Sequence, residues 1–597
     1  MIRQTIRALQ RYTKDNGGFV AATRKVARLA WLLLRTTGFA GLFTEVRQTL
    51  KARQAQVALL QRKKILATLA QSKQVAILTT PHAMFVAHML NHGLARRGFR
   101  VSIITSPPSL GYGDAIYLVI SPQMFARLPM NMIAFQMEQS TSTRWFTPRY
   151  LDQLRNAVAI LDYSRINIDY LTRQGIPYGN IFYLPIAPVP DYLDLLSEHG
   201  LNLDRSGRKD YDVLFYGDVN NERRRTILGK LGERFNVTIV GNLFGRELYD
   251  KLLRARVVVN IHYYENALLE TTRISECLSL GVSVVSESSS DRSDYPELEA
   301  RVRYVKVGDV GAMIDAIESL LSDETDPAAE AQAGEAETVG ATASAFYLDR
   351  FLLAFGLTDF ETMSSTEAQP PRFSTGRICL SLPETMARRN SFLAQGQSAY
   401  ELFDGMRGAQ GWIGCGLSYK YLLQRAKRAG LPRLLICEDD VVLTSAAEDS
   451  LAVVYDYLDS IDGQWDVFAG LIAHLHPDVT VSRVAEHGGL TFAHLDKMTS
   501  MVFNIYNRSI YDLLIAWDES DENPRSNTVD RYLESRDNLR VVTAVPFIVG
   551  HSEDDTSTLW GFGNRQYVEL ISRSQLLLQS KVDAVRAQAN AGGSGQA

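Results

Sequence analysis

The sequence predicts an α/β protein made of three consecutive α/β units, and three observations lead to this class. The chain has 597 residues, which is too long for a single hydrophobic core, so several domains are expected. From Gln74 onward, short apolar segments alternate with longer helix-like segments, and this alternation predicts parallel sheets covered by helices. Hydrophobic residues make up 46% of the chain and charged residues 22%, which is typical of a folded globular protein.

The first unit is expected at residues 71–200. Its opening strand is Val75–Leu78, followed by a helix over Met84–Arg97 and a strand over Arg100–Thr105. The later elements expected in this unit are strands at Ala115–Ile120, Met132–Gln136 and Ile181–Leu184 and a helix at Leu151–Leu161. The pattern predicts a Rossmann-like lobe.

A second series of the same kind is expected at residues 201–357. The expected strands are Asp212–Tyr216, Val237–Val240, Val257–Ile261 and Val282–Ser286. The expected helices are Arg223–Phe235, Glu247–Ala255, Thr271–Leu280 and Ser344–Gly356, with a loop at 323–342. Two lobes in tandem place a cleft between them, and ligands of parallel sheets bind beyond the carboxyl ends of the strands.

A linker is expected at 358–375, because Thr362–Ser374 is polar and contains Pro370-Pro371. A third α/β unit is expected at 376–583. The remaining segment, 584–597, is rich in Ala, Gln, Gly and Ser and is expected to be a disordered tail.

The amino-terminal segment, 1–70, is expected to be a basic helical extension. Residues 1–64 carry many Lys and Arg residues, opposed only by Asp15 and Glu45, and apolar patches at Ala30–Leu34 and Phe39–Phe43 lie among them. Two interpretations remain open. The extension binds to an anionic membrane surface, or it packs on the next domain with its basic face in water.

Composition excludes several classes of function. The net charge of −4 gives no argument for nucleic-acid binding, so no nucleic-acid partner is expected. The four cysteines form no CxxC pair, as in a reduced cytoplasmic protein without a zinc site. No apolar run reaches the length that spans a bilayer. A cytoplasmic protein is expected, either free or held peripherally at the inner face of the membrane.

The most informative feature is the acidic run Glu438-Asp439-Asp440, which follows the apolar segment Leu434–Cys437. A buried strand that ends in carboxylates directs negative charge into the crevice at the edge of a sheet. Hard oxygen ligands suit Mg²⁺ or Mn²⁺, and such an ion suits a substrate that carries a diphosphate. Glu438, Asp439 and Asp440 are therefore the candidate metal ligands. A strand-end turn of solvated acids is the alternative.

Several segments around this run resemble glycosyltransferase family 25, the lipopolysaccharide and collagen galactosyltransferase-like enzymes. These segments are Ile378–Leu382 with Arg388-Arg389, Phe403-Asp404-Gly405, Gly414–Ser418, Leu434–Asp440, Trp465–Phe468, Val529–Tyr532 and His551–Ser557. Tyr419 stands where the family has a His after this Ser. The resemblance covers roughly the last 200 residues of the chain.

The resemblance implies a single α/β domain of the GT-A type that uses a nucleotide sugar, expected to be UDP-linked, and usually a metal. On this basis Asp440 would hold the metal, and Arg388 or Arg389 would contact phosphate. Glu438 and Ser418 would lie at the nucleotide. Asp530, Asp554 and Asp555 are candidates for the base that accepts the acceptor's hydroxyl proton, with Asp530 preferred. A helix cap is the other interpretation of Asp530.

The first two units resemble the two-lobed GT-B glycosyltransferases of the group-1-like bacterial type. The resemblance rests on Leu161–Ser164, Phe215-Tyr216-Gly217, Val259–His262 and Leu269–Glu276. It implies that Arg273 and Gly217 lie at the donor phosphates, that Glu276 binds a donor hydroxyl, and that Glu270 does either job or caps a helix. The usual spacing of two Glu residues is absent, since Leu268 stands eight residues before Glu276.

Together the two resemblances imply a glycosyltransferase with two modules. Its acceptor would be a bacterial surface polysaccharide, a lipopolysaccharide or a lipid-linked saccharide. Two further interpretations remain open: that only the carboxyl-terminal module is catalytic while the amino-terminal one binds glycan or nucleotide, and that the chain is a non-catalytic scaffold at the membrane.

Overall fold

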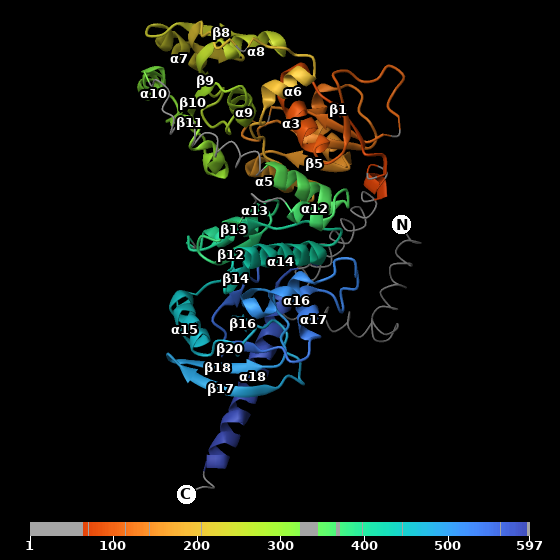
Figure 1. The fold of residues 1–597 in the computed structure, drawn as a ribbon, viewed down its shortest axis with the longest axis vertical. Coiled ribbons are helices and arrows are strands. Elements are labelled where there is room, and N and C mark those ends of the chain that lie inside the picture. Colours follow the sequence, from red (N-terminus) through yellow and green to blue (C-terminus); the bar gives the residue numbers. More distant parts are fainter. Residues whose placement is uncertain are drawn as a thin grey trace.

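A computed structural model describes residues 64–322, 344–365 and 371–593, except for the single positions 68, 70, 114, 143, 205, 397, 445 and 562. The expected basic extension before Lys64 and the expected loop at 323–342 lie outside the described residues. The described chain has the predicted α/β class: two Rossmann-like lobes lie side by side at one end of the long axis, and a third α/β unit lies at the other (Figure 1).

The first lobe is an entirely parallel sheet with strand order β2-β1-β3-β4-β5-β6. Its strands are β1 Gln74–Leu78, β2 Arg100–Ile104, β3 Tyr117–Ile120, β4 Met132–Gln136, β5 Ala159–Asp162 and β6 Ile181–Tyr183. Its helices are η1 Pro81–Ala83, α3 Met84–Ala95, η2 Pro122–Met124, α4 Pro148–Asn156, α5 Arg165–Arg173, η3 Tyr178–Asn180 and α6 Tyr192–Glu198.

The single helix expected at Leu151–Leu161 was wrong. Helix α4 ends at Asn156, Ala157 is extended, and the apolar residues that follow form strand β5. Ala159 pairs with Ile133 of β4, and Ile160 with Ile181 of β6. The apolar run is therefore a central strand buried on both faces, a pattern that periodicity does not distinguish from a buried helix.

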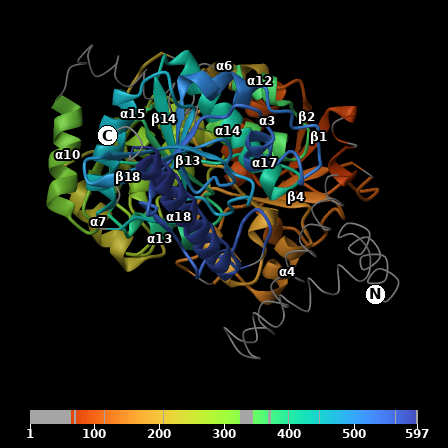
Figure 2. The same ribbon diagram turned by 90° about the horizontal axis from the view of Figure 1, so that it is seen from below.

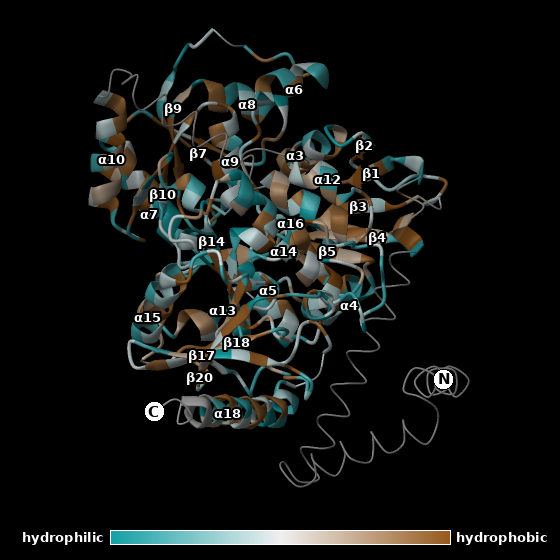
Figure 3. Ribbon diagram, turned by 60° about the horizontal axis from the view of Figure 1, so that its bottom comes forward, coloured by the Kyte–Doolittle hydropathy of each residue, from teal (hydrophilic) through white to brown (hydrophobic). Residues whose placement is uncertain are grey.

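The second lobe is also parallel, with strand order β11-β10-β9-β7-β8. Its strands are β7 Tyr211–Tyr216, β8 Val237–Val240, β9 Ala255–Asn260, β10 Ser283–Glu287 and β11 Val302–Val305. Its helices are α7 Glu222–Gly232, α8 Arg246–Leu253, α9 Thr271–Ser279, η4 Arg292–Asp294, η5 Pro296–Leu298 and α10 Val310–Ser322. Hydrophobic colour follows most strands of the lobes, and the strands in the middle of each sheet are buried (Figure 3).

The segment between the lobes and the third unit is partly helical. Residues 344–354 are helical, and α12 spans Phe360–Ser364 within the expected linker. Phe360 and Met363 are buried in the core of the third unit. The start of the linker is thus packed rather than extended, because two apolar side chains one helical turn apart face that core.

The third unit has a mixed sheet with strand order β13-β12-β14-β19-β16-β20-β18-β17. Its strands are β12 Arg377–Ser381, β13 Glu401–Asp404, β14 Arg433–Glu438, β16 Val467–Ala469, β17 Val481–His487, β18 Leu490–Leu495, β19 Phe503–Asn507 and β20 Val541–Val545, and β15 Val441–Val442 pairs separately with β21 Gly550–His551. Its helices are α13 Met386–Leu393, α14 Gly411–Arg428, α15 Ala447–Ser460, η6 Arg508–Ile510, α16 Tyr511–Ile515, α17 Val529–Glu534 and α18 Arg565–Gly593.

The disordered tail expected from residue 584 was wrong over most of its length. Helix α18 runs to Gly593 and lies at the front of the view in Figure 2. Leu578 and Val582 of this helix are fully buried, and Arg586 pairs with Glu486 of β17. The Ala- and Gln-rich composition that suggested a tail is also a good helix former once the preceding turns are packed.

Candidate active sites

The carboxyl ends of three parallel strands in the third unit meet at one cavity. Strand β12 lies between β13 and β14, so the connection from β12 to β13 runs to one side of β12 and the connection from β13 leads to β14 on its other side. Open parallel sheets bind ligands at such switch points. A cavity of about 1000 Å³ opens there. Its wall includes Ser381 at the end of β12, Gly405 just after β13, Glu438 at the end of β14 and Asp439 just after it.

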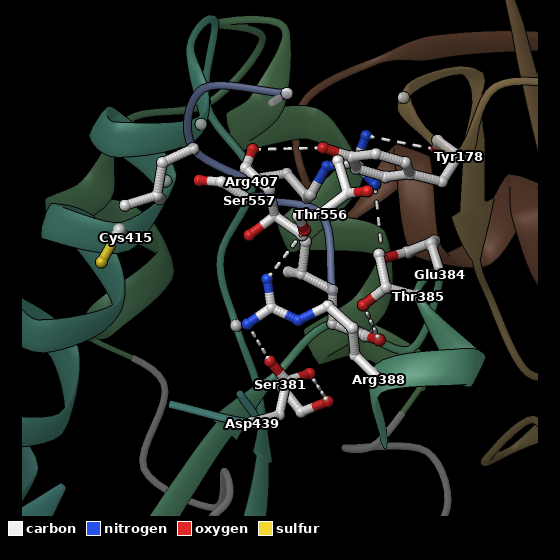
Figure 4. Close-up of a pocket in the computed structure, with 18 of the residues that line it drawn as sticks. Tyr178, Ser381, Glu384, Thr385, Arg388, Arg407, Cys415, Asp439, Thr556 and Ser557 are labelled. Atoms are coloured by element: carbon white, nitrogen blue, oxygen red, sulfur yellow. Dashed lines mark hydrogen bonds and ion pairs between the residues drawn. The ribbon is translucent and has the colours of Figure 1, made fainter. Parts of the chain in front are cut away.

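Arg388 bridges two of the three predicted acids. Its guanidinium lies 2.5 Å from Asp439 Oδ1 and 3.0 Å from Asp440 Oδ2, and it also donates to the Thr556 carbonyl at 3.2 Å. Asp439 Oδ2 accepts a 2.7 Å hydrogen bond from Ser381. Figure 4 shows Arg388 between Asp439 and the 556–557 loop. The positive charge thus lies next to the acids in the cavity wall.

Burial and mutual charge separate the pKa values of the acids. Burial, followed by the charge of Asp440, raises the pKa of Glu438. Burial also raises the pKa of Asp439. Burial opposes ionisation of Asp440 as well, but Arg388, His551 and Asn564 outweigh it and lower the pKa of Asp440 below its ordinary value. Asp440 is therefore the acid that stays ionised most firmly.

Two neighbours of Asp440 were not assigned a role from the sequence. His551 Nε2 lies 3.4 Å from Asp440 Oδ2, and Asn564 donates to the same oxygen at 3.0 Å. Asp440 Oδ1 and His551 Nδ1 are buried without a hydrogen-bond partner. The only sequence signal for this contact was the position of His551 in a segment resembling the family's closing motif; the pairing of β15 with β21 makes it.

The donor set around Asp440 fits a divalent ion only in part. Within the described residues, no three His, Cys, Asp or Glu side chains form a group that could hold a metal. The three predicted ligands, Glu438, Asp439 and Asp440, do not converge on one point, because the Asp439 carboxylate is bonded to Ser381 and Arg388. Asp440 and His551 are nevertheless adjacent and each has an unpartnered buried atom. Mg²⁺ commonly takes one or two protein ligands and completes its shell with water and substrate phosphates.

The other predicted residues of this unit are distributed differently. Arg389 faces away from the acids and pairs with Asp404 at 2.5 Å. Ser418 lines the cavity, but its hydroxyl accepts from Met406 N and donates to the Gly414 carbonyl. Asp530 lies in the first turn of α17, and its carboxylate accepts from the Arg531 N–H. The charge of Asp530 contributes to raising the pKa values of Glu438 and Cys415, but Asp530 is not among the residues that line the cavity.

The second lobe brings three predicted residues together at its own switch point, between β7 and β9. Gly217 follows β7 with a φ of +136°, and a Cβ atom there would lie 3.0 Å from the Arg273 guanidinium. Arg273 pairs with Glu270 and donates to Asn260 Oδ1 at 2.6 Å. Glu270 also accepts from Arg224, and these cations with His262 lower its pKa to about 2 despite burial.

Glu276 lies further along α9 in a chain of buried hydroxyls. Tyr216 donates to its carboxylate at 2.7 Å. Tyr249 also bonds to it and lies 3.0 Å from the Tyr192 hydroxyl, which in turn contacts His88 at 2.9 Å. Burial raises the pKa of Glu276 to about 7. The chain crosses from the second lobe to α3 and α6 of the first.

Comparisons with known proteins give weak similarity only. No family model and no curated protein matches the chain. Solved structures that align with about half of it include sucrose-phosphate synthase from Thermosynechococcus elongatus, at 14% identity over 49% of this chain and 96% of that one, with a TM-score of 0.26. The Anabaena protein HepE in complex with UDP and glucose aligns at 11% over 49% and 100%, with a TM-score of 0.30. An α-glucosyltransferase in complex with UDP-glucose and DNA aligns at 8% over 47% and 99%, with a TM-score of 0.32.

The chemistry open to the chain follows from the geometry of its two sites. Of the helices in the described ranges, none is both long and apolar enough to cross a bilayer. The third unit offers a cavity whose wall holds the guanidiniums of Arg388 and Arg407 and the acids Glu438 and Asp439, with Asp440 paired to Arg388 next to that wall. The second lobe offers a glycine, an arginine and two glutamates where parallel strands diverge. Both arrangements can accept an anion next to groups able to bind a polar ligand.

Proposed function

We propose that this chain is a glycosyltransferase that uses nucleotide-sugar donors, and that its third unit carries a metal-assisted transfer. The observation that carries the proposal is the position of Arg388 between Asp439 and Asp440 in the wall of a 1000 Å³ cavity at the strand ends. The cavity is large enough for a drug-sized ligand. It combines a cation that can bind phosphate with carboxylates that can bind a metal, and both suit a nucleoside diphosphate as leaving group.

In the proposed reaction, the oxygen of the acceptor hydroxyl bonds to C1 of the donor sugar while the C1–O bond to the diphosphate breaks, and negative charge grows on the departing diphosphate. Arg388 donates charge-assisted hydrogen bonds to that diphosphate. Asp440 and His551 are the residues that would hold Mg²⁺ or Mn²⁺, which supplies electrostatic stabilisation of the leaving group when bound. Asp530 takes the proton of the acceptor hydroxyl. Glu438 and Asp439 set the local charge around these groups.

In the paired lobes, we propose that Gly217, Arg273 and Glu270 contact the donor phosphates and Glu276 a donor hydroxyl, without a metal. The approach of Arg273 to Gly217 supports this, because a side chain at position 217 would occupy the space next to the guanidinium. The alternative is that the lobes bind glycan or nucleotide without turnover. This alternative is supported by the contacts of Arg273, whose guanidinium is already bonded to Glu270 and Asn260 in this structure.

The acceptor and the place of action remain proposals from the sequence. A bacterial surface polysaccharide or lipopolysaccharide, or a lipid-linked saccharide precursor, is the proposed acceptor. The basic segment 1–64 would hold the protein against the anionic inner face of the cytoplasmic membrane.

The test is hydrolysis or transfer of a panel of nucleotide sugars by the full chain with Mn²⁺. Asp440→Asn should reduce the metal-dependent rate roughly 100-fold or more, as expected for losing a group that stabilises transition-state charge. Asp512→Asn, a change at a carboxylate whose side chain is 76% exposed, is the matched control and should leave the rate unchanged.

A chelator should abolish the same activity that Asp440→Asn abolishes. Any activity that depends on Glu276, and is therefore lost in Glu276→Gln, should persist when the chelator is added to the native chain. If only the Asp440 change matters, the lobes are a binding module. Absence of turnover with every donor would refute the enzymatic proposal.

A further inference from the structure

The cavity of the third unit is not built by that unit alone. Part of its wall is the turn Gly175–Asn180 of the first lobe, between α5 and β6. The residues of the third unit that face this turn come from the ends of β12 and β13 and from the 554–561 loop. Figure 4 shows Tyr178 of the first lobe at one side of the cavity and Asp439 at the other, with Arg388 between them.

Specific contacts hold the turn against the third unit. The Tyr178 hydroxyl donates to the Thr558 carbonyl at 3.1 Å. Arg407, which follows β13, donates to the carbonyls of Ile181 at 3.3 Å and Tyr178 at 3.5 Å. The Arg407 guanidinium also lies 5.5 Å from the centre of the Tyr178 ring and 4.6 Å from that of Phe182. These contacts hold the Tyr178 side chain and the backbone around it at the edge of the cavity.

A buried polar network fixes the relative position of the two units. Glu384 of the third unit receives two bonds from Arg350, at 2.6 and 2.7 Å, and one from the Tyr183 N–H of the first lobe at 2.9 Å. Asp404 pairs with Arg165 of the first lobe at 3.0 Å and with Arg389 at 2.5 Å. These groups are desolvated, so separating the units would leave several charges without partners.

The polarity of the cavity changes from one end to the other. Across the sheet, the order β14, β12, β13 leads from the acids and Arg388 to Arg407 and the turn of the first lobe. The turn contributes Ile176, Pro177 and Tyr178, which carry no charged side chain, and the charges of Arg407 and Glu384 beside it are paired with each other at 3.3 Å. A nucleoside diphosphate has the same asymmetry, with its charge at the diphosphate and a flat, weakly polar base at the opposite end.

We propose that Tyr178 and its turn form the nucleobase end of the nucleotide site, so that the first lobe completes the binding site of the third unit. This inference rests on the proposed function, because it places the diphosphate at Arg388 and Asp440. The aromatic ring gives a flat surface to the base, and its hydroxyl holds the 556–558 loop that Arg388 also contacts. Tyr178 is a specificity-determining residue in this arrangement.

The test measures binding of UDP and of inorganic pyrophosphate to the full-length chain with Mn²⁺, by calorimetry. Tyr178→Ala should raise the Kd for UDP roughly 5- to 50-fold, the range expected for losing one aromatic–base contact, and leave the Kd for pyrophosphate unchanged. Tyr178→Phe keeps the ring and should fall between Tyr178→Ala and the native chain. Tyr112→Phe removes a similar bond, a 2.9 Å contact to the Arg127 carbonyl elsewhere in the first lobe, and should change neither Kd.

The outcomes separate this inference from the proposed function. If the native chain binds neither UDP nor other nucleoside diphosphates, the proposed function fails. If it binds UDP and Tyr178→Ala binds it equally well, the inference is overturned. Equal weakening for UDP and pyrophosphate also overturns it, because Tyr178 would then support the fold of the whole site rather than the base.

Discussion

The contact between the first lobe and the third unit should depend on the charge of Glu384. Its side chain and that of Arg350 are 0% exposed. Its carboxylate receives both Arg350 bonds and lies 3.3 Å from Arg407. Glu384→Gln keeps the size of the side chain and an oxygen that accepts the Tyr183 N–H, but it removes the only negative charge in this group of three.

The expected loss follows from the two cations that remain. Breaking a buried ion pair by removing one partner costs about 3–5 kcal/mol, because an uncompensated charge stays buried. Arg350 keeps its bond to the Gly405 carbonyl, which limits the loss toward the lower part of that range. We therefore expect about 3 kcal/mol of destabilisation from Glu384→Gln in urea unfolding followed by circular dichroism.

The matched control is Glu318→Gln. Glu318 pairs with Arg234 at 2.9 Å, but the two side chains are 48% and 59% exposed. An exposed pair of this kind is worth about 0–1 kcal/mol, so the control should unfold almost as the native chain does. If Glu384→Gln were no more destabilising than Glu318→Gln, the buried network would not be what fixes the two units together.

Two further predictions concern stability within the units. Burial raises the pKa of Glu276 to about 7, so the stability that its protonated form provides is full below its ordinary pKa and is lost as the pH rises through 7. Glu276→Gln should therefore gain stability over the native chain between pH 5 and pH 8, by up to about 3 kcal/mol, and an equal difference at both pH values would contradict the burial argument. Leu578→Ala, in the fully buried face of α18, should cost about 2–5 kcal/mol in the same unfolding assay, whereas Leu576→Ala, at a position 72% exposed, should cost about 0.5 kcal/mol or less. Similar losses in the two leucine variants would show that the end of α18 is not packed as described.

Local pattern was enough to predict most of the strands and the place of the acids. The apolar run before Glu438 indicated a buried strand, and the acids at its end indicated a polar cluster at a sheet edge. Apolar periodicity does not separate a buried strand from a helix, and this caused the error at Leu151–Leu161, where an amphipathic helix passes directly into a strand buried on both faces. Only pairing with β4 and β6 decides where the change occurs.

The sequence by itself determined the α/β class, the order of the units and which residues follow the strands, because each depends on the spacing of apolar and polar residues along the chain. Tertiary structure decided which of those residues meet. Arg388 and Arg389 are adjacent in sequence, yet successive helical positions point about 100° apart, so one faces the acids and the other faces Asp404. The contacts of His551 with Asp440 and of Tyr178 with the 558 loop join residues more than 100 positions apart. Such contacts depend on how whole sheets and lobes pack, and no local pattern encodes them.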